Sequence, residues 1–187
     1  MRRYAISHSA LLGGVERLPE WVAWLDAQGV EMVQIREKQL SARSLAGLVE
    51  RCVARARSIR ILVNTRADIA LACGAHGVHL PGGAPAPALW RRIAPSGFLI
   101  GVSCHGAEEC AAAAREGADF AVISPVFAPL SKVTPEQPLG LDRLARICRA
   151  TGLPLYALGG VDAGNAAACC AAGAAGVAGI TQFLPHG

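Results

Sequence analysis

The chain has 187 residues, the usual size of a single domain, and residues 1–187 are expected to fold as one unit. Hydrophobic residues make up 52% and charged residues 17%, which excludes an intrinsically disordered chain. The net charge of +4 comes from scattered basic residues and aromatic residues reach only 5%, so no nucleic-acid partner is expected. Since no apolar stretch is typical of a membrane span or a secretory signal, we expect no membrane association and a cytoplasmic location.

Seven cysteines are spread along the chain, an odd number without any CxxC pair. None of them forms a zinc-type spacing with histidine. We interpret them as reduced thiols that pack as small hydrophobic side chains.

One pattern recurs in chain order: a glycine, a small residue and then a short apolar run, each time after an alanine-rich stretch. It begins at Gly29, Gly74, Gly117 and Gly173, where glycine is typical of a helix end in the left-handed conformation. Other apolar runs lie between these, so eight strands are predicted, within residues 3–6, 29–33, 61–64, 74–78, 99–102, 117–122, 155–158 and 173–177. Helices are predicted near residues 19–28, 41–58, 67–73, 85–93, 107–116, 141–150 and 163–172.

Strict alternation of strands and helices predicts a parallel sheet, and eight strands favour a closed (β/α)8 barrel, or TIM barrel. An open, doubly wound sheet is the alternative, but the GxGxxG fingerprint is absent after the first strand. Few residues follow the last strand, so we expect a compact barrel whose last helix is truncated or missing. The first and seventh helices would then have exposed flanks that can pack against a second copy as a homodimer.

Function in such a barrel lies at the C-terminal ends of the strands. At the end of the second strand, alternation places Gln34, Arg36 and Lys38 on the side that faces the barrel interior. Two cations there call for an anion, so this segment predicts phosphate or pyrophosphate binding, and a structural ion pair is the alternative. Asn64, at the end of the third strand, either orients a ligand or caps the next helix.

The fourth and fifth strands end in histidines. His79 is interpreted equally well as a buried structural residue and as a ligand-binding one. In the fifth strand Ser103 and His105 share one face, while Cys104 points away. His105 is the best general acid–base candidate, and a helix-capping role is its alternative.

The last part of the chain offers anion-binding groups. Residues 124–138 form a long loop in which Lys132 could close over an anion, although a solvated lysine is the simpler interpretation. The final two strands end in Gly159, Gly160, Gly179 and Ile180. Backbone N–H groups at these ends are typical phosphate ligands in barrels.

Several of these stretches resemble the thiamin phosphate synthase/TenI family. The matching segments are QIREK at 34–38, IGVSCH at 100–105, LGGVDAGN at 158–165 and the longer runs 62–83 and 117–132. The resemblance implies a (β/α)8 barrel that acts on small phosphorylated thiamin precursors. Its synthase branch joins a pyrimidine pyrophosphate to a thiazole phosphate with Mg²⁺, and holds the pyrophosphate at positions that match Gln34, Arg36, Lys38, Asn64 and Lys132.

The same resemblance shows a departure. Two Mg²⁺-binding aspartates of the synthase branch fall at Thr65 and within residues 81–84, where this chain has no carboxylate. The sister branch, thiazole tautomerase, needs no metal and uses a histidine at the end of the fifth strand, which is His105 here.

We therefore expect a thiazole tautomerase that uses His105 and Ser103, needs no cofactor and binds a phosphorylated thiazole. One alternative is thiamin phosphate synthase, which would require Mg²⁺. Another is a non-catalytic protein that binds a thiamin precursor and regulates a partner.

Overall fold

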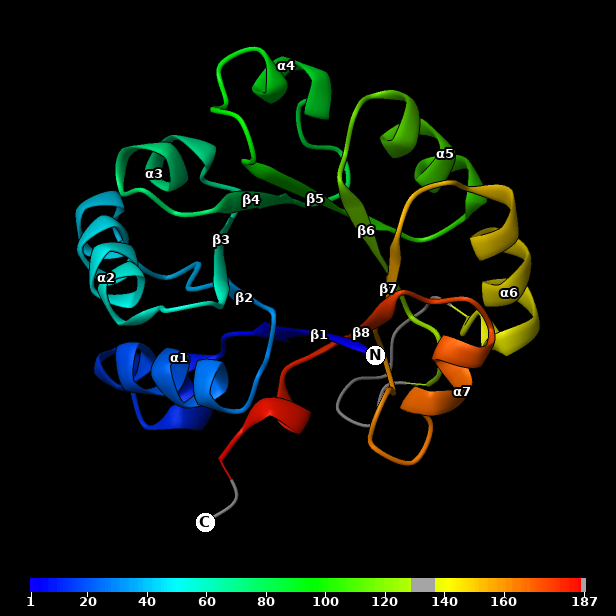
Figure 1. Cartoon of the computed structure of the whole chain (residues 1–187), viewed down its shortest axis with the longest axis horizontal. Helices are drawn as coiled ribbons and strands as arrows, with labels where there is room; N and C mark the ends of the chain where they lie inside the picture. The colour runs from blue at the N-terminus through cyan, green and yellow to red at the C-terminus, as the bar shows by residue number, and fades with distance from the viewer. Residues whose placement is uncertain (129–136, 186–187) are drawn as a thin grey trace.

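A closed barrel of eight parallel strands forms the centre of the molecule in the computed structural model, which describes residues 1–128 and 137–185 (Figure 1). Each strand pairs with the next in sequence, and β1 pairs with β8 to close the barrel. The strands are β1 (Arg2–Ile6), β2 (Met32–Ile35), β3 (Arg60–Asn64), β4 (Gly77–Leu80), β5 (Leu99–Cys104), β6 (Phe120–Ile123), β7 (Leu155–Ala157) and β8 (Gly176–Gly179). The predicted (β/α)8 barrel is confirmed, and the open-sheet alternative is wrong.

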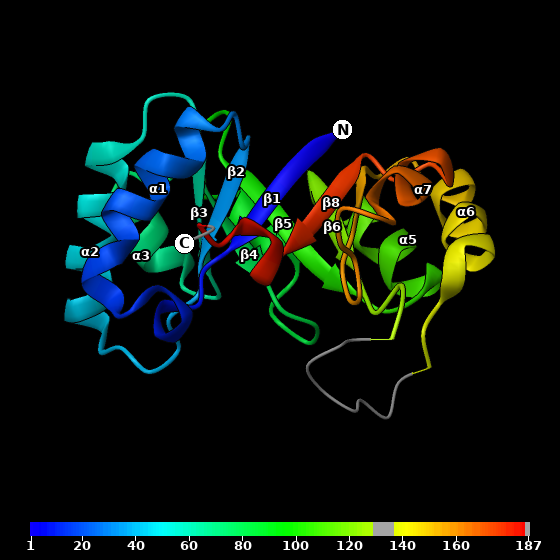
Figure 2. The same ribbon diagram turned by 90° about the horizontal axis from the view of Figure 1, so that it is seen from below.

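Seven α-helices of the described residues surround the strands (Figure 1). They are α1 (Leu18–Ala27), α2 (Ala42–Arg55), α3 (Ala67–Ala72), α4 (Pro87–Arg91), α5 (Ala107–Arg115), α6 (Gly140–Ala150) and α7 (Ala166–Ala171). From below, α1, α2 and α3 lie on one side of the barrel and α5, α6 and α7 on the other (Figure 2). The four glycines of the repeated pattern all have positive φ, between 68° and 103°. Each lies just past a helix end, as the repeat predicts. None of the helices in the described residues is long and apolar enough to cross a membrane.

Alternation along each strand divides the core into an interior and an outer layer. Inside the barrel, Tyr4, Phe120 and Tyr156 pack together with aliphatic side chains. Between the barrel and the helices, residues such as Ile35 and Cys104 pack in two apolar clusters. This division directs Gln34 and Ser103 inward, because each lies one position before one of these outward-facing residues.

The position after β8 is taken by a short 3-10 turn, Thr181–Phe183, among the described residues. It lies beside α1 in Figure 1 (red and blue). Phe183 is buried in the same apolar cluster as Trp21 of α1, and the Trp21 indole N–H donates to the Phe183 carbonyl at 2.8 Å. The expectation of an exposed flank on α1 is therefore wrong at Trp21, because Phe183 covers it.

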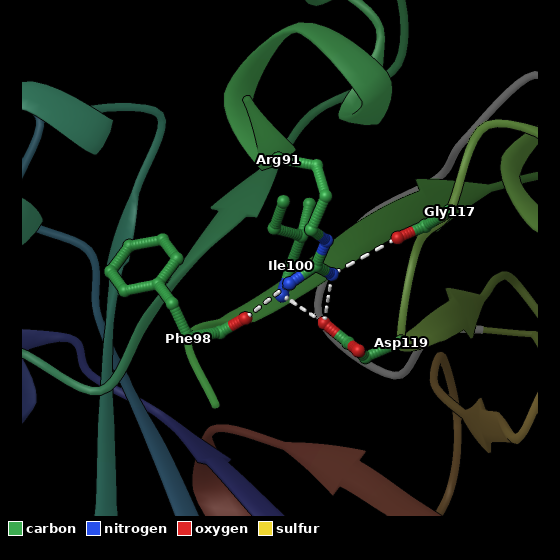
Figure 3. A network of polar contacts seen from close by, with 5 residues as sticks. All are labelled: Arg91, Phe98, Ile100, Gly117 and Asp119. Atoms are coloured by element: carbon green, nitrogen blue, oxygen red, sulfur yellow. Dashed lines mark hydrogen bonds and ion pairs between the residues drawn. The ribbon is translucent and has the colours of Figure 1, made fainter. Parts of the chain in front are cut away.

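One arginine, Arg91, links the short helix α4 to the barrel through hydrogen bonds and an ion pair (Figure 3). Arg91 donates to the carbonyls of Phe98 at 2.7 Å and Gly117 at 3.0 Å, and to the Asp119 carboxylate at 2.6 Å. The same carboxylate accepts the Ile100 backbone N–H at 2.6 Å. One guanidinium thus joins α4 to the beginnings of β5 and β6.

Candidate active site at the barrel mouth

The C-terminal ends of the strands form the barrel mouth, and β2 contributes three polar side chains close to it. Gln34 is inside the barrel and 2% exposed, Arg36 is half-buried, and Lys38 is exposed. Neither Arg36 nor Lys38 forms an ion pair with a described residue. The ion-pair alternative is therefore not supported in the described part of the chain, and two positive charges remain available to an anion.

A buried carboxylate holds the backbone around Arg36 in place. Glu37 accepts hydrogen bonds from the hydroxyls of Ser7 and Ser9, both at 2.6 Å, and from the Ser9 backbone N–H at 3.2 Å. The Ser7 hydroxyl in turn accepts the Arg36 backbone N–H at 2.8 Å. No local pattern predicted this anchor, although Ser7 and Ser9, within three residues after β1, are the signal that could have indicated it.

Asn64 does not cap the following helix. The N-terminal cap of α3 is Arg66, without a side-chain cap bond, and the Asn64 amide donates to the Thr65 hydroxyl at 2.9 Å. Thr65 has φ of +66°, a left-handed conformation that is uncommon for a β-branched residue. The helix-capping alternative for Asn64 is wrong, because this turn separates the strand end from the helix start.

His79 is inside the barrel, 3% exposed, and is bonded on both sides of its ring. Its Nδ1 lies 3.2 Å from the Tyr4 hydroxyl, and its Nε2 lies 2.9 Å from the Ser103 hydroxyl. Burial, together with the positive charge of Arg36, lowers the pKa of His79 to about 3. At neutral pH the ring is therefore uncharged, which is typical of a buried structural imidazole.

His105 follows β5 directly and is exposed. Its Nδ1 lies 2.8 Å from the Ser124 carbonyl oxygen, which can only accept, so Nδ1 carries the proton and Nε2 is left as a proton acceptor. The cap residue of α5 is Gly106, so the helix-capping alternative for the His105 side chain is wrong. His105 and Ser103 both line a hollow of about 470 Å³ that extends along residues 80–87 and α5.

The four positions predicted to bind phosphate lie at the ends of β7 and β8. No described residue accepts the backbone N–H of Gly159, Gly160 or Ile180. A Cβ on Gly159 would lie 2.8 Å from Pro125, and one on Gly160 would lie 2.5 Å from the Ala128 carbonyl oxygen. The close approach at these two glycines is therefore to the segment after β6, an explanation that the sequence analysis did not include.

The described residues do not fit a protein-built Mg²⁺ site. They contain no group of three or more His, Cys, Asp or Glu side chains able to hold a metal ion. Nearby carboxylates are already engaged, since Glu37 accepts several hydrogen bonds and Asp68 pairs with Arg66. Lys132, predicted to close over an anion, lies outside the described residues.

Comparisons with known proteins agree with this geometry. A family model described as thiamine monophosphate synthase matches residues 3–183. The chain belongs to this family. A putative thiamine-phosphate synthase from Geobacter sulfurreducens is 45% identical over 84% of this chain and 75% of its own length. A putative thiamine-phosphate synthase 2 from Aquifex aeolicus is 40% identical over 98% of this chain and 97% of its own length.

A solved structure is similar as well. The thiamine phosphate pyrophosphorylase from Pyrococcus furiosus superposes with a TM-score of 0.81 at 28% identity, over 96% of this chain and 85% of that chain. Membership of the thiamine monophosphate synthase family places the chain among the enzymes of thiamin biosynthesis. The expected family is thus confirmed, whereas the comparisons favour the synthase alternative over the tautomerase that the sequence analysis preferred.

Proposed function

We propose that this chain is a thiamin phosphate synthase that joins a pyrimidine pyrophosphate to a thiazole phosphate at the barrel mouth. The observation that carries the proposal is the pair of cations at the end of β2, Arg36 and Lys38, which have no described carboxylate partner. The names of the relatives support the same reaction, among them a thiamine-phosphate synthase from Methanoculleus marisnigri that is 41% identical over 86% of this chain.

The chemistry required is stabilisation of a leaving group. As the bond between the two rings forms, the bond to pyrophosphate breaks and negative charge collects on the departing oxygen. Arg36 can bind two phosphate oxygens with its planar fork, and Lys38 adds a second positive charge. Asn64 offers an amide at the neighbouring strand end. The N–H groups of Gly159, Gly160 and Ile180, which no described residue accepts, suit the phosphate of the thiazole, whereas Gly179 belongs to β8 and pairs with β1.

Mg²⁺ is the cofactor that this reaction implies, and the donor set at the mouth does not suit it. Thr65 and the segment 81–84, which contains no carboxylate, stand where the resemblance places the two aspartates. We expect weak dependence on Mg²⁺ and a slow synthase reaction, because arginine and lysine alone must neutralise the pyrophosphate.

A second candidate is the thiazole tautomerase reaction, in which a proton moves between two atoms of a thiazole carboxylate phosphate. The observation that favours it is His105, whose Nε2 is an acceptor without a partner among the described residues, because Nδ1 is bonded to the Ser124 carbonyl. This reaction needs no metal, which agrees with the absence of a carboxylate set at the mouth in the described residues.

One set of assays separates the two reactions. The purified chain is given either pyrimidine pyrophosphate, thiazole phosphate and Mg²⁺, or the thiazole tautomer alone. For the synthase, we expect thiamin phosphate and pyrophosphate to form, and Arg36→Ala to lower the rate at least about a hundredfold. The matched control is Arg43→Ala, an exposed arginine on α2.

For the tautomerase, turnover of the thiazole alone is expected and is lost in His105→Asn but kept in Arg43→Ala. Aromatisation without any thiamin phosphate would overturn the synthase proposal and select the second candidate. Tight binding of the thiazole phosphate with neither turnover would overturn both reactions and leave a thiamin-precursor-binding regulatory protein.

A further inference from the structure

A row of hydrogen bonds crosses the mainly apolar interior of the barrel. It runs from Gln34 of β2 through Tyr4 of β1 and His79 of β4 to Ser103 of β5. Gln34, Tyr4 and His79 are 2%, 0% and 3% exposed. Because such groups lose their water on folding, each depends on its neighbour in this row for a hydrogen bond. Removing one member leaves a buried polar group unpaired, which lowers stability.

The buried phenol proton of Tyr4 needs an acceptor, and this requirement sets the direction of donation. The Gln34 amide nitrogen donates to the Tyr4 hydroxyl at 3.1 Å, so this hydroxyl oxygen is an acceptor on that side. Burial raises the pKa of Tyr4, and the phenol keeps its proton and donates it to Nδ1 of His79. The neutral imidazole then carries its own proton on Nε2 and donates it to the Ser103 hydroxyl.

The ring of His79 cannot turn freely between these partners. Its centroid lies 5.7 Å from the ring of Tyr4 and 6.1 Å from that of Phe120. Tyr4 and Phe120 also pack edge to face against each other, at 5.4 Å. Aromatic packing therefore fixes the plane in which Nε2–H meets Ser103.

Ser103 is the last residue of this row of hydrogen bonds and lies at the mouth. Its oxygen accepts from His79, and it is half-buried beside His105 in the wall of the same hollow. A serine hydroxyl normally rotates to suit its surroundings, but an oxygen that already accepts from one side has its own O–H directed elsewhere. Ser103 lies one residue before the end of β5, so its O–H is next to the mouth.

We propose that His79 is a positioning residue that fixes the Ser103 hydroxyl as a hydrogen-bond donor to the ligand in the barrel mouth, and that Tyr4 and Gln34 set the tautomer of His79. The inference rests on the proposed function only in placing the reaction at the mouth. It gives a function to three buried polar groups, Gln34, Tyr4 and His79, whose burial otherwise only costs stability.

A matched pair of variants tests the proposal kinetically. His79→Leu fills the space without a donor, whereas His79→Gln keeps an N–H in reach of Ser103. We expect His79→Leu to lower kcat/KM by about ten- to a hundredfold and His79→Gln to stay within about threefold of the parent. Equal losses in the two variants would show that His79 only packs, and would overturn the proposal.

A double variant tests whether His79 acts through Ser103. If it does, His79→Leu combined with Ser103→Ala is no slower than Ser103→Ala alone. Multiplied losses would mean that the two side chains contribute independently, which would also overturn the proposal.

A spectroscopic measurement keeps this test separate from the proposed function. In the full chain labelled with ¹⁵N-histidine, the ring of His79 is expected as the neutral Nε2–H tautomer at pH 7, and Tyr4→Phe is expected to admit the Nδ1–H form. An Nδ1–H or doubly protonated ring in the parent would overturn the inference. If the chain catalyses neither reaction, the proposed function fails, while the ring signal still decides the role of His79.

Discussion

At the scale of single residues, the mouth combines groups that are ready to bind with groups that hold them in position. Arg36 is half-buried and His105 is exposed, and both keep functional atoms without a partner among the described residues, whereas Glu37 and His79 are buried and hydrogen-bonded. Burial makes the latter rigid, because neither can exchange its partner for water. Positioning of this kind is what a site needs to hold a charged ligand in one geometry.

The buried imidazole of His79 gives folding a pH dependence. Its pKa of about 3 lies below the value of about 6.5 in the unfolded chain, so between these values only the unfolded state binds the proton. Stability is therefore complete above about pH 6.5 and falls as the pH is lowered, by up to about 1.4 kcal/mol per pH unit. Urea unfolding at pH 7.5 and pH 5.0 measures it, and His79→Gln is expected to lose less over this range. Equal losses in both proteins would contradict the assignment.

Thr65 offers a second test at the residue scale. Its left-handed backbone suits Asp and Asn better than a β-branched residue, so Thr65→Asp and Thr65→Asn should each raise the free energy of unfolding by about 0.5 kcal/mol. Only the aspartate adds an oxygen ligand of the kind that Mg²⁺ prefers. We expect Thr65→Asp alone to increase the Mg²⁺-dependent synthase rate, with Thr65→Asn as the neutral control. Equal rates in the two variants would show that the lost carboxylate is not what limits the reaction.

At the scale of elements, the helices differ widely in how they are held. α1 and α2 are long and bury several large apolar side chains. α4 has only five residues, and Leu89 on it is 54% exposed. A helix this short is marginal by itself, so its place depends on tertiary contacts, among them the Arg91 network of Figure 3.

Removing the Arg91 guanidinium should destabilise α4 more than the other helices. Arg91→Ala is expected to lower the free energy of unfolding by about 1 kcal/mol, a modest value because this ion pair is partly exposed. Hydrogen exchange of the α4 amides should accelerate more than that of α2. The neighbouring, exposed Arg92→Ala is the control and should change neither quantity. Unchanged exchange in Arg91→Ala would mean that apolar contacts hold α4.

In the molecule as a whole, strand pairing closes the barrel, and side-chain packing closes the layer of helices around it. β1 pairs with β8, and outside that seam Phe183 packs on α1 where the ring of helices lacks a full helix among the described residues. The hydrogen bond from Trp21 to Phe183 joins residues that are 162 positions apart. Contacts of such sequence separation tie both ends of the described chain into one core.

Phe183 should therefore contribute to global stability. Phe183→Ala is expected to lower the free energy of unfolding by about 3 kcal/mol, because it removes a buried ring and leaves a cavity. The melting temperature should fall by roughly 6–12 °C in a chain of this size. The exposed neighbour Thr181→Ala is the control, with a change within about 0.5 kcal/mol. A loss below about 1 kcal/mol for Phe183→Ala would show that the turn merely rests on the surface.

Local sequence patterns account for the elements and their alternation. Apolar periodicity and the glycines at the helix ends predict all eight strands and seven helices, because both features depend on neighbours within a few positions. The same alternation correctly directed Gln34 and Ser103 inward. The capping role considered for Asn64 is wrong, because a left-handed turn at Thr65 separates it from the helix.

Which of these residues contact each other depends on the closed fold. Tyr4 and His79 lie 75 positions apart, and their contact follows from the curvature of the closed barrel rather than from any local pattern. The glycines after β7 make room for the segment after β6, and Phe183 reaches α1 only because β8 pairs with β1. Local propensity sets whether each segment becomes a helix or a strand. Barrel closure and strand register set which segments contact each other, and the candidate site is formed by such contacts.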